Sequence, residues 1–345
     1  MVSAQRILYA MPSVQLLLLN AALRLYLRPR AAQVKTPLDL RRLPDSRPPA
    51  PRGVRFRSDR VGGVEGEWAE AEGEATALMC YLHGGGYASL APRDYRALTG
   101  GFAKRGFRVF AVDYRLAPEH PFPAALADAA AVFRAMAGGD ERPVVVCGDS
   151  AGGGLAAALM LRLRDEAAPL PAAACLFSPW LDLTNASASR ATNSQRDHAI
   201  GPMASGAMDM FASTYANGTD LREPAVSPVF GSLEGLPPTV LFVGESEVLR
   251  DDSVCFAERG RREGVTIHLE VWPDVPHVWP ILHALLPEGR KAIDLSAGLL
   301  LRAASWPAAR PVMEARAAAV RTEQALGADV RRELQDPARL SPDVR

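Results

Sequence analysis

The chain has no excess of charge of either sign: 39 lysines and arginines balance 39 aspartates and glutamates in its 345 residues. A protein that binds nucleic acid normally carries a basic excess, so this balance argues against a nucleic-acid partner. The sequence is also poor in cysteine, with four that lie far apart and form no Cys-x-x-Cys pair. It therefore predicts neither a disulfide framework nor a metal site, and we expect a reducing, cytoplasmic location.

A long, uninterrupted apolar segment is missing as well. Residues 7–23 carry no charge, but Pro12 interrupts them, and they are short for a membrane span of about 20 residues. Asn20, Arg24 and Arg28 follow one another at intervals of four and form a narrow polar stripe, which leaves a wide apolar face on the predicted helix. An apolar helix face of this width is normally buried against another surface. Packing on the protein itself is favoured, and a membrane surface or a membrane anchor are the alternatives.

What the chain does have is a regular alternation of strands and helices. Two alternating segments are typical of an exposed antiparallel pair, and continuous apolar runs alternate with helices after them. The expected strands are 53–59, 61–71, 76–82, 107–112, 143–147, 171–177, 238–243 and 265–272. The expected helices are roughly 93–105, 124–136, 151–165 and 251–263. This pattern predicts an α/β fold with an eight-stranded, mostly parallel sheet and helices on both of its faces.

Two regions interrupt this alternation. Residues 185–225 are polar, contain several methionines and are predicted to form an insertion of short helices. Residues 306–345 are rich in Ala, Arg and Glu, and we expect a surface helix followed by disorder there. The core is then predicted to comprise residues 51–184 and 226–305, with helices in residues 1–50 preceding it.

A glycine-rich turn follows the fifth expected strand, in "VVVCGDSAGGGLAAALM" at 144–160. The spacing from Gly152 to Ala157 matches a dinucleotide-binding fingerprint, but that fingerprint belongs to the first strand–helix unit of a sheet. The segment around Gly148 and Ser150 instead matches Gly-x-Ser-x-Gly, a strand-to-helix turn that exposes a nucleophilic serine. A helix start whose glycines serve only close packing is the structural alternative.

A nucleophilic serine needs a histidine within hydrogen-bond reach and a carboxylate that orients the histidine. Of the six histidines, His277 lies on a short loop just beyond the last expected strand, where the serine is predicted to be exposed. We therefore expect His277 to be the base, and the loop after the seventh strand to supply the acid. The candidates are Glu245, Glu247, Asp251 and Asp252. Asp251 and Asp252 stand at a helix start, where carboxylates commonly cap the helix, so Glu247 is favoured and Asp251 is the alternative.

An earlier glycine-rich stretch, "HGGGYASL" at 83–90, follows the third expected strand. Consecutive glycines leave bare backbone that can turn sharply or bring N–H groups close to a ligand. A phosphate-binding loop would end in Gly-Lys-Ser or Gly-Lys-Thr, and neither is present here. The loop is therefore predicted to face a developing oxyanion, together with the N–H group of Ala151.

Six linked motifs resemble the bacterial hormone-sensitive-lipase-like family of serine esterases. They are "HGGG" at 83–86, "DYRLAPEHPFPAAL" at 113–126, "GDSAGG" at 148–153, "SPWLDLT" at 178–184, "EVLRDD" at 247–252 and "VWPDVPHVW" at 271–279. The resemblance covers roughly residues 50–305. It implies an α/β-hydrolase core with a cap built from the N-terminal helices and the 185–225 insertion.

The resemblance also implies site residues. They are Ser150 as nucleophile, His277 as general base and, as oxyanion donors, Gly84, Gly85 and Ala151. Most relatives have aspartate at the position of Glu247, whereas a subset with the same Glu-Val-Leu pattern uses glutamate. Candidate residues of the substrate pocket are Tyr87, Trp180, Met208 and Phe211.

The predicted function is a serine carboxylesterase that hydrolyses short- to medium-chain acyl esters through an acyl-enzyme, without a cofactor. A lipase or amidase acting at a lipid interface is the alternative, because of the apolar N-terminal helix. A non-catalytic small-molecule receptor on the same scaffold is a third hypothesis. Beyond the small ester substrate, the expected partners are a membrane surface, contacted peripherally by the N-terminal helix, and a second copy of the chain paired along the last strand.

Overall fold

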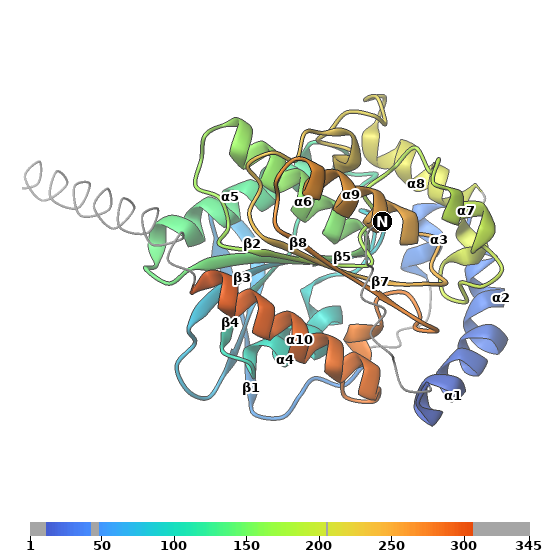
Figure 1. Ribbon diagram of the computed structural model, residues 1–345, viewed down its shortest axis with the longest axis horizontal. Helices are drawn as coiled ribbons and strands as arrows, with labels where there is room; N and C mark the ends of the chain where they lie inside the picture. Colours follow the sequence, from blue (N-terminus) through green and yellow to red (C-terminus); the bar gives the residue numbers. More distant parts are fainter. Residues whose placement is uncertain (1–11, 43–47, 205, 306–345) are drawn as a thin grey trace, which may run out of the picture.

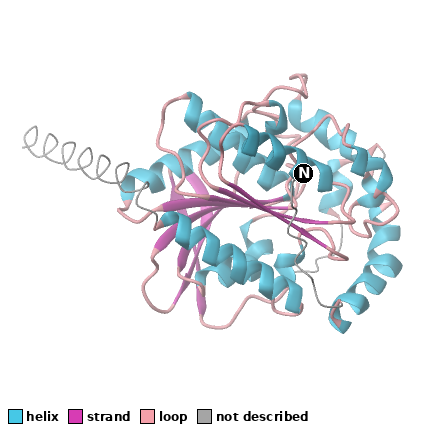
Figure 2. Ribbon diagram, in the orientation of Figure 1, coloured by secondary structure: helices cyan, strands magenta, loops and turns pink. Residues whose placement is uncertain are grey.

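An eight-stranded sheet crosses the molecule and carries helices on both faces (Figures 1 and 2). The computed structural model describes residues 12–42, 48–204 and 206–305. The strand order is β1-β2-β4-β3-β5-β6-β7-β8; β2 is antiparallel to both of its neighbours, and all later pairs are parallel. The predicted fold class, a mostly parallel eight-stranded α/β sheet, is thereby confirmed.

The central strands are buried on both sides, which explains their continuous apolar sequences. Every residue of β3, β5, β6 and β7 is buried, as expected for parallel strands that helices cover on both faces. The strands are β1 (Val54–Val61), β2 (Val64–Ala71), β3 (Ala77–Leu82), β4 (Phe107–Val112), β5 (Val144–Asp149), β6 (Ala174–Phe177), β7 (Thr239–Gly244) and β8 (Ile267–Trp272). The carboxyl ends of the parallel strands share one edge of the sheet, and ligands of open α/β sheets bind at such edges.

Two layers of helices enclose this sheet. Helices α5 (Ala124–Gly139), α6 (Ser150–Asp165) and α9 (Arg250–Arg262) pack on one face, with the larger of two apolar clusters between them and the strands. Helices α4 (Arg96–Ala103) and α10 (Pro287–Ala304) pack on the other face (Figure 1). Three short 3₁₀ helices complete the core: η2 (Pro92–Tyr95), η4 (Pro228–Phe230) and η5 (Trp279–Leu282).

The remaining helices lie beside the carboxyl ends of β5 to β8, and we call them the cap. Their N-terminal part consists of α1 (Val14–Ala22), the π-helical turn η1 (Leu23–Leu27), α2 (Arg28–Ala31) and α3 (Pro37–Arg41). Their second part consists of α7 (Ala188–Thr192), η3 (Gly201–Met203) and α8 (Ala207–Ala216), within the insertion expected at 185–225. The tail expected at 306–345 lies outside the described residues.

Helix α1 does not pack its wide apolar face on the protein, so the favoured expectation for that face is wrong. Leu16 is the one buried residue of α1, whereas Leu17 and Leu18 are exposed. Asn20 and Arg28 of the polar stripe point inward instead: the Asn20 side chain donates a hydrogen bond of 2.7 Å to the carbonyl of Asp274, and Arg28 donates to the carbonyl of Ser194 at 3.2 Å. Among the described residues, no helix is long and apolar enough to cross a membrane.

Candidate active site

Ser150 is the first residue of α6 and directly follows β5, on a tight strand-to-helix turn. Its φ of +52° lies in the left-handed region that residues other than glycine seldom adopt. A Cβ atom at Gly152 would collide with the backbone oxygens of Leu82 and His83. One at Gly148 would collide with the carbonyl of Gly152. The chain therefore needs both glycines of Gly-x-Ser-x-Gly to hold the serine at the carboxyl edge of the sheet.

His277, on the loop after β8, connects this serine to a carboxylate from the loop after β7. Its Nε2 lies 3.0 Å from Ser150 Oγ, and its Nδ1 lies 2.7 Å from Glu247 Oε2. With the proton on Nδ1, the imidazole donates to the carboxylate and its Nε2 can accept the serine proton. The three side chains thus form one hydrogen-bonded chain of nucleophile, base and acid.

The carboxylate of Glu247 is buried, with 1% of its surface exposed, and both of its oxygens are hydrogen-bonded. Oε1 accepts from Ser178 Oγ at 2.8 Å and from the Gly244 N–H at 2.6 Å, which leaves Oε2 for His277. Ser178 Oγ also accepts from the N–H of Val278 at 3.1 Å, so it joins the acid loop to the histidine loop. We did not predict this role of Ser178, although it directly follows a buried strand and is the first residue of the "SPWLDLT" motif.

The alternative acid, Asp251, points elsewhere. Its carboxylate accepts from the backbone N–H of Ser189 at 2.8 Å and from the Arg250 side chain at 2.8 Å. These contacts attach the start of α9 to α7 in the cap. The hydrogen bond to His277 comes from Glu247, so the geometry favours Glu247 over Asp251 as the orienting acid.

Two opposing effects set the pKa of His277. Burial, the largest single effect, lowers it. The hydrogen bond and negative charge of Glu247, together with the charges of Asp197 and Asp149, raise it, and the resulting pKa lies above its usual value of 6.5. A base of this kind is a better proton acceptor than free imidazole once it is neutral, and its imidazolium is stabilised while it holds the serine proton.

The first amide of the glycine loop is already used inside the protein. The Gly84 N–H donates to Asp149 Oδ1 and to Tyr95 Oη, both at 3.0 Å. Asp149 also accepts from Tyr81 Oη at 2.5 Å and from Tyr95 Oη at 3.0 Å. The expectation that Gly84 donates to an oxyanion is therefore wrong: its N–H fixes the loop to the residue before the nucleophile.

The amides that follow are better placed for an oxyanion. The Gly85 carbonyl accepts from the N–H groups of Ala88 and Ser89 at 3.1 Å each, which closes the loop into a turn. Ala151 lies in the first turn of α6, where backbone N–H groups have no acceptor within the helix. Gly85 and Ala151 thus remain candidate donors, and Gly86 joins them in the place of Gly84.

This arrangement of strands and side chains can be compared with known proteins. A family model described as the alpha/beta hydrolase fold matches residues 79–281, more than half of the chain. The chain belongs to the alpha/beta hydrolases. It is 41% identical over 248 residues to an acetyl-hydrolase of Streptomyces hygroscopicus, covering 71% of this chain and 82% of that protein. It is 35% identical over 245 residues to an esterase of Acinetobacter venetianus, covering 70% and 80%.

Solved structures of this hydrolase family agree with the fold. A hormone-sensitive lipase from a metagenome library superposes with a TM-score of 0.77 at 32% identity, over 83% of this chain and 98% of that one. Esterase EstE5 in a crystal soaked with p-nitrophenyl butyrate gives 0.78 at 35% identity, over 85% and 100%. The predicted hormone-sensitive-lipase-like family and carboxylesterase activity are thereby confirmed, and the chain is a carboxylic ester hydrolase.

Two of the four predicted pocket residues of this hydrolase lie near the glycine loop. Tyr87, Trp180, Met208 and Phe211 are all buried. The Phe211 ring, from α8, lies 3.5 Å from the position of a Cβ atom at Gly86, so it borders the site from the cap side. Tyr87 stacks on Tyr215 with ring centroids 3.8 Å apart.

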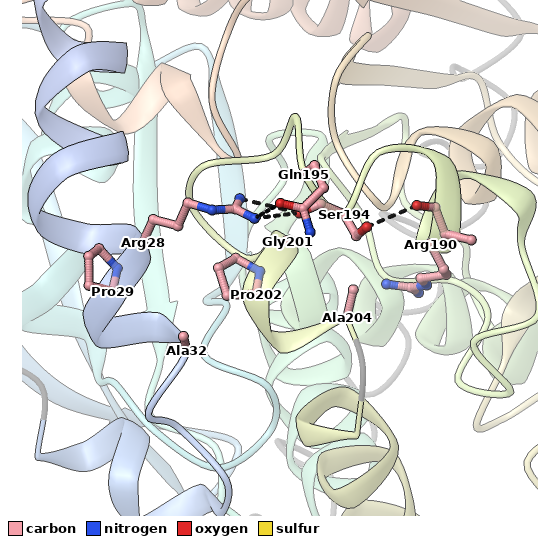
Figure 3. Close-up of a pocket in the computed structure, with 10 residues that line it drawn as sticks. Arg28, Pro29, Ala32, Arg190, Ser194, Gln195, Gly201, Pro202 and Ala204 are labelled. Carbon is pink, nitrogen blue, oxygen red and sulfur yellow. Dashed lines mark hydrogen bonds between the residues drawn. The ribbon is translucent and has the colours of Figure 1, made fainter.

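The other two pocket candidates surround a buried arginine of the cap. Met208 Sδ lies 3.2 Å from the guanidinium of Arg190, and that guanidinium lies 5.8 Å from the centre of the Trp180 ring. Arg190 pairs with the buried Asp252 at 3.3 Å and lines a cavity of about 660 Å³ between α2 and the insertion (Figure 3). Ser150 is not among the described residues that line this cavity.

A second cavity, of about 480 Å³, lies between the N-terminal helices, the insertion and the acid loop. Its lining includes Arg24, Arg28 and His198, and it reaches Glu247. Arg28 lines both cavities and donates to the carbonyl oxygens of Ser194 at 3.2 Å and of Asp197 at 3.1 Å. Within the described ranges, no three His, Cys, Asp or Glu side chains are placed to hold a metal ion.

Proposed function

We propose that this hydrolase cleaves short- to medium-chain acyl esters through an acyl-enzyme on Ser150. The observation that carries the proposal is the hydrogen-bonded chain from Ser150 Oγ through His277 to Glu247, with distances of 3.0 and 2.7 Å. This is the donor–acceptor order that nucleophilic ester cleavage requires.

The proposed mechanism uses these atoms in turn. His277 Nε2 takes the proton of Ser150 Oγ while the oxygen attacks the ester carbonyl, and Glu247 stabilises the imidazolium that forms. The oxyanion accepts from the N–H groups proposed above, those of Gly85, Gly86 and Ala151. The imidazolium then gives its proton to the departing alcohol. In the second half, His277 deprotonates a water that attacks the acyl group and releases the acid and free Ser150.

The proposed acyl size rests on the contact between α8 and the glycine loop. Phe211 lies against Gly86, next to the carbonyl position, and would limit the length of an acyl chain there. The names of the compared proteins support short chains: one is an acetyl-hydrolase, and the EstE5 crystal was soaked with a four-carbon ester.

Hydrolysis of p-nitrophenyl esters from acetate to palmitate tests the proposal. We expect the wild type to cleave the short esters best, and Ser150→Ala to lower kcat/KM by about 10⁴-fold or more. Ser213→Ala, at an exposed position of α8, is the matched control and should leave the rate unchanged. Full activity of Ser150→Ala would refute the proposed nucleophile, and a preference for palmitate would refute the proposed chain length.

A second candidate function, a lipase or amidase acting at a lipid interface, is supported by the exposed apolar side chains of α1. It predicts a rate that rises sharply when a long-chain substrate passes its critical micelle concentration. If the rate instead saturates smoothly through that concentration, the interfacial function is rejected and hydrolysis of soluble esters remains the proposal.

Location and assembly are also proposals. A cytoplasmic, reducing location is supported by the free thiols of Cys147 and Cys175, which stand opposite each other on β5 and β6. A homodimer paired along β8 is supported by the place of that strand at one edge of the sheet. Light scattering coupled to size-exclusion chromatography would test the dimer, and a monomeric mass at micromolar concentration would contradict it.

A further inference from the structure

The N-terminal helices carry an apolar surface that points away from the protein. We call it the α1 face; its members are exposed and recur at helical spacing: Val14, Leu17, Leu18, Ala21, Ala22, Leu25, Tyr26 and Pro29. Leu18, Leu25 and Tyr26 each expose about two thirds of their surface, at 67%, 67% and 66%. Eight apolar residues in one continuous face are unusual on a protein surface and mark an interaction site.

Hydrogen bonds fix the helix in this orientation. The N–H and Oγ of Ser13 both donate to the carboxylate of Glu288 at 2.9 Å, which holds the start of α1 against α10. Asn20 is bound to the carbonyl of Asp274, and Arg28 donates to backbone carbonyls of the insertion at 3.1 to 3.3 Å. Because these polar contacts use the inner side of the helix, the exposed apolar side chains face away from the protein. Helix α1 itself lies at the lower right of Figure 1.

The charges around the α1 face indicate what covers it. The first 38 residues of the chain contain four arginines and one lysine, and no aspartate or glutamate. Arg24 and Arg30 are exposed and stand next to Leu25 and Pro29 of the face in the chain, and Arg24 also lines the second cavity. A second copy of the chain would bring the same positive charges against each other, whereas anionic lipid headgroups would neutralise them. Tyr26 also suits a lipid–water interface, where aromatic side chains are enriched.

We propose that the α1 face binds the surface of an anionic lipid bilayer. The helix lies in the plane of the interface, with Leu17, Leu18 and Leu25 entering the acyl region and the arginines contacting lipid phosphates. This contact would hold the hydrolase where ester substrates that partition into membranes are concentrated. The proposal concerns binding alone, so it stands or falls independently of the chemistry at Ser150.

Cosedimentation of the full chain with vesicles tests it. We would compare vesicles of phosphatidylcholine and phosphatidylglycerol at 3:1 with vesicles of phosphatidylcholine alone. The wild type should bind the anionic vesicles, and the double variant Leu18→Glu/Leu25→Glu should bind them at least about tenfold more weakly. Binding should also weaken when sodium chloride is raised to about 0.5 M, because salt screens the headgroup charge. Leu285→Glu is the matched control: it changes an equally exposed leucine, at 59%, outside the α1 face and should bind like the wild type.

Circular dichroism and turnover of p-nitrophenyl acetate would show that each variant is folded, since both leucines of the double variant are exposed and neither belongs to the proposed site. A wild type that sediments with neither vesicle refutes the proposal. So does a double variant that binds as tightly as the wild type. If vesicles do not bind and the double variant converts a dimer into a monomer in sedimentation velocity, the α1 face is an interface between copies and the lipid proposal is wrong.

Discussion

At the scale of single residues, the two oxygens of Glu247 have different tasks. Oε1 is held by Ser178 and the Gly244 amide, and Oε2 orients His277. In Glu247→Gln the amide has one acceptor oxygen for these three donors, so one of the contacts becomes a donor facing a donor. We expect kcat on p-nitrophenyl acetate to fall by about 10³- to 10⁴-fold, as when the acid of a triad is replaced by its amide.

The matched change, four residues later in the first turn of α9, is Asp251→Asn. That carboxylate contacts Ser189 and Arg250 rather than His277, so kcat should stay within about fivefold of the wild type, while stability drops slightly. The reverse ranking of Glu247→Gln and Asp251→Asn would transfer the role of the acid to Asp251.

The pH dependence of kcat/KM reports the protonation of His277 in the free enzyme. The base must be neutral to accept the serine proton, so activity is lost as pH falls through its pKa. Because Glu247 raises this pKa above 6.5, we expect the midpoint of the acid limb above pH 6.5 in the wild type. Glu247→Gln removes the stabilising charge, so the midpoint of its residual activity should move to lower pH. A midpoint that stays in place would show that another group controls the limb.

Sequence reasoning reached Ser150, His277 and Glu247 because each follows a recognisable strand and has side-chain chemistry that fits its role. It placed Gly84 wrongly, since the acceptor of the Gly84 amide is a side chain 65 residues later in the chain. It missed Ser178 for the same reason: the hydroxyl has meaning only beside Glu247, 69 residues away. Hydrogen bonds between residues far apart in the chain produce no periodic pattern in the sequence, so they cannot be predicted from it.

At the scale of elements, α8 presents neighbouring residues in opposite directions. Phe211 is buried against the glycine loop, whereas Met210 is 46% exposed. We expect Phe211→Ala to raise kcat/KM for octanoate relative to acetate by roughly tenfold, because the space of the ring becomes available to a longer acyl chain. Met210→Ala, on the same helix, should leave the chain-length profile unchanged. If Phe211→Ala lowers the rate on all esters equally, the ring positions α8 and does not select the acyl chain.

Strands were easier to predict than the faces of the terminal helices. Five parallel strands are largely apolar, so their positions could be predicted from composition, although β6 begins three residues later than expected and β5 ends two residues later. Helix α10 was not among the expected helices, although a proline at its first position and the buried Ile293 and Leu300 fit a helix that packs on the sheet. The outward orientation of the apolar face of α1 could not be predicted from its amphipathic pattern. It depends on hydrogen bonds to Asp274 and Glu288, which lie more than 250 residues later in the chain.

At the scale of the whole molecule, the site assembles where the carboxyl ends of four strands meet the cap. The glycine loop follows β3, and the proposed nucleophile, acid and base follow β5, β7 and β8, so the sheet sets their spacing. The cap also holds one of these loops, the acid loop after β7, in place. The Asn193 side chain donates to the carbonyls of Glu245 at 3.0 Å and Glu247 at 2.9 Å, and Asp197 accepts from the N–H of Val248 at 3.1 Å. The insertion therefore holds the backbone of the acid loop at the residues on either side of the Glu247 carboxylate, the proposed acid.

These hydrogen bonds predict that a substitution in the cap lowers the rate of catalysis without changing Ser150, His277 or Glu247. Asn193→Ala leaves two carbonyls without their donor, which costs about 1–3 kcal/mol and should lower Tm by roughly 2–10 °C. Because the freed loop carries Glu247, kcat should also fall by about tenfold, with KM for a short ester little changed. Ser194→Ala, at the next residue, is the control: it removes a hydroxyl that donates to the carbonyl of Ala191, three residues earlier, and should do neither. A loss of Tm with an unchanged kcat would mean that Asn193 stabilises the insertion alone, and the cap would then be a cover with no part in holding the acid in place.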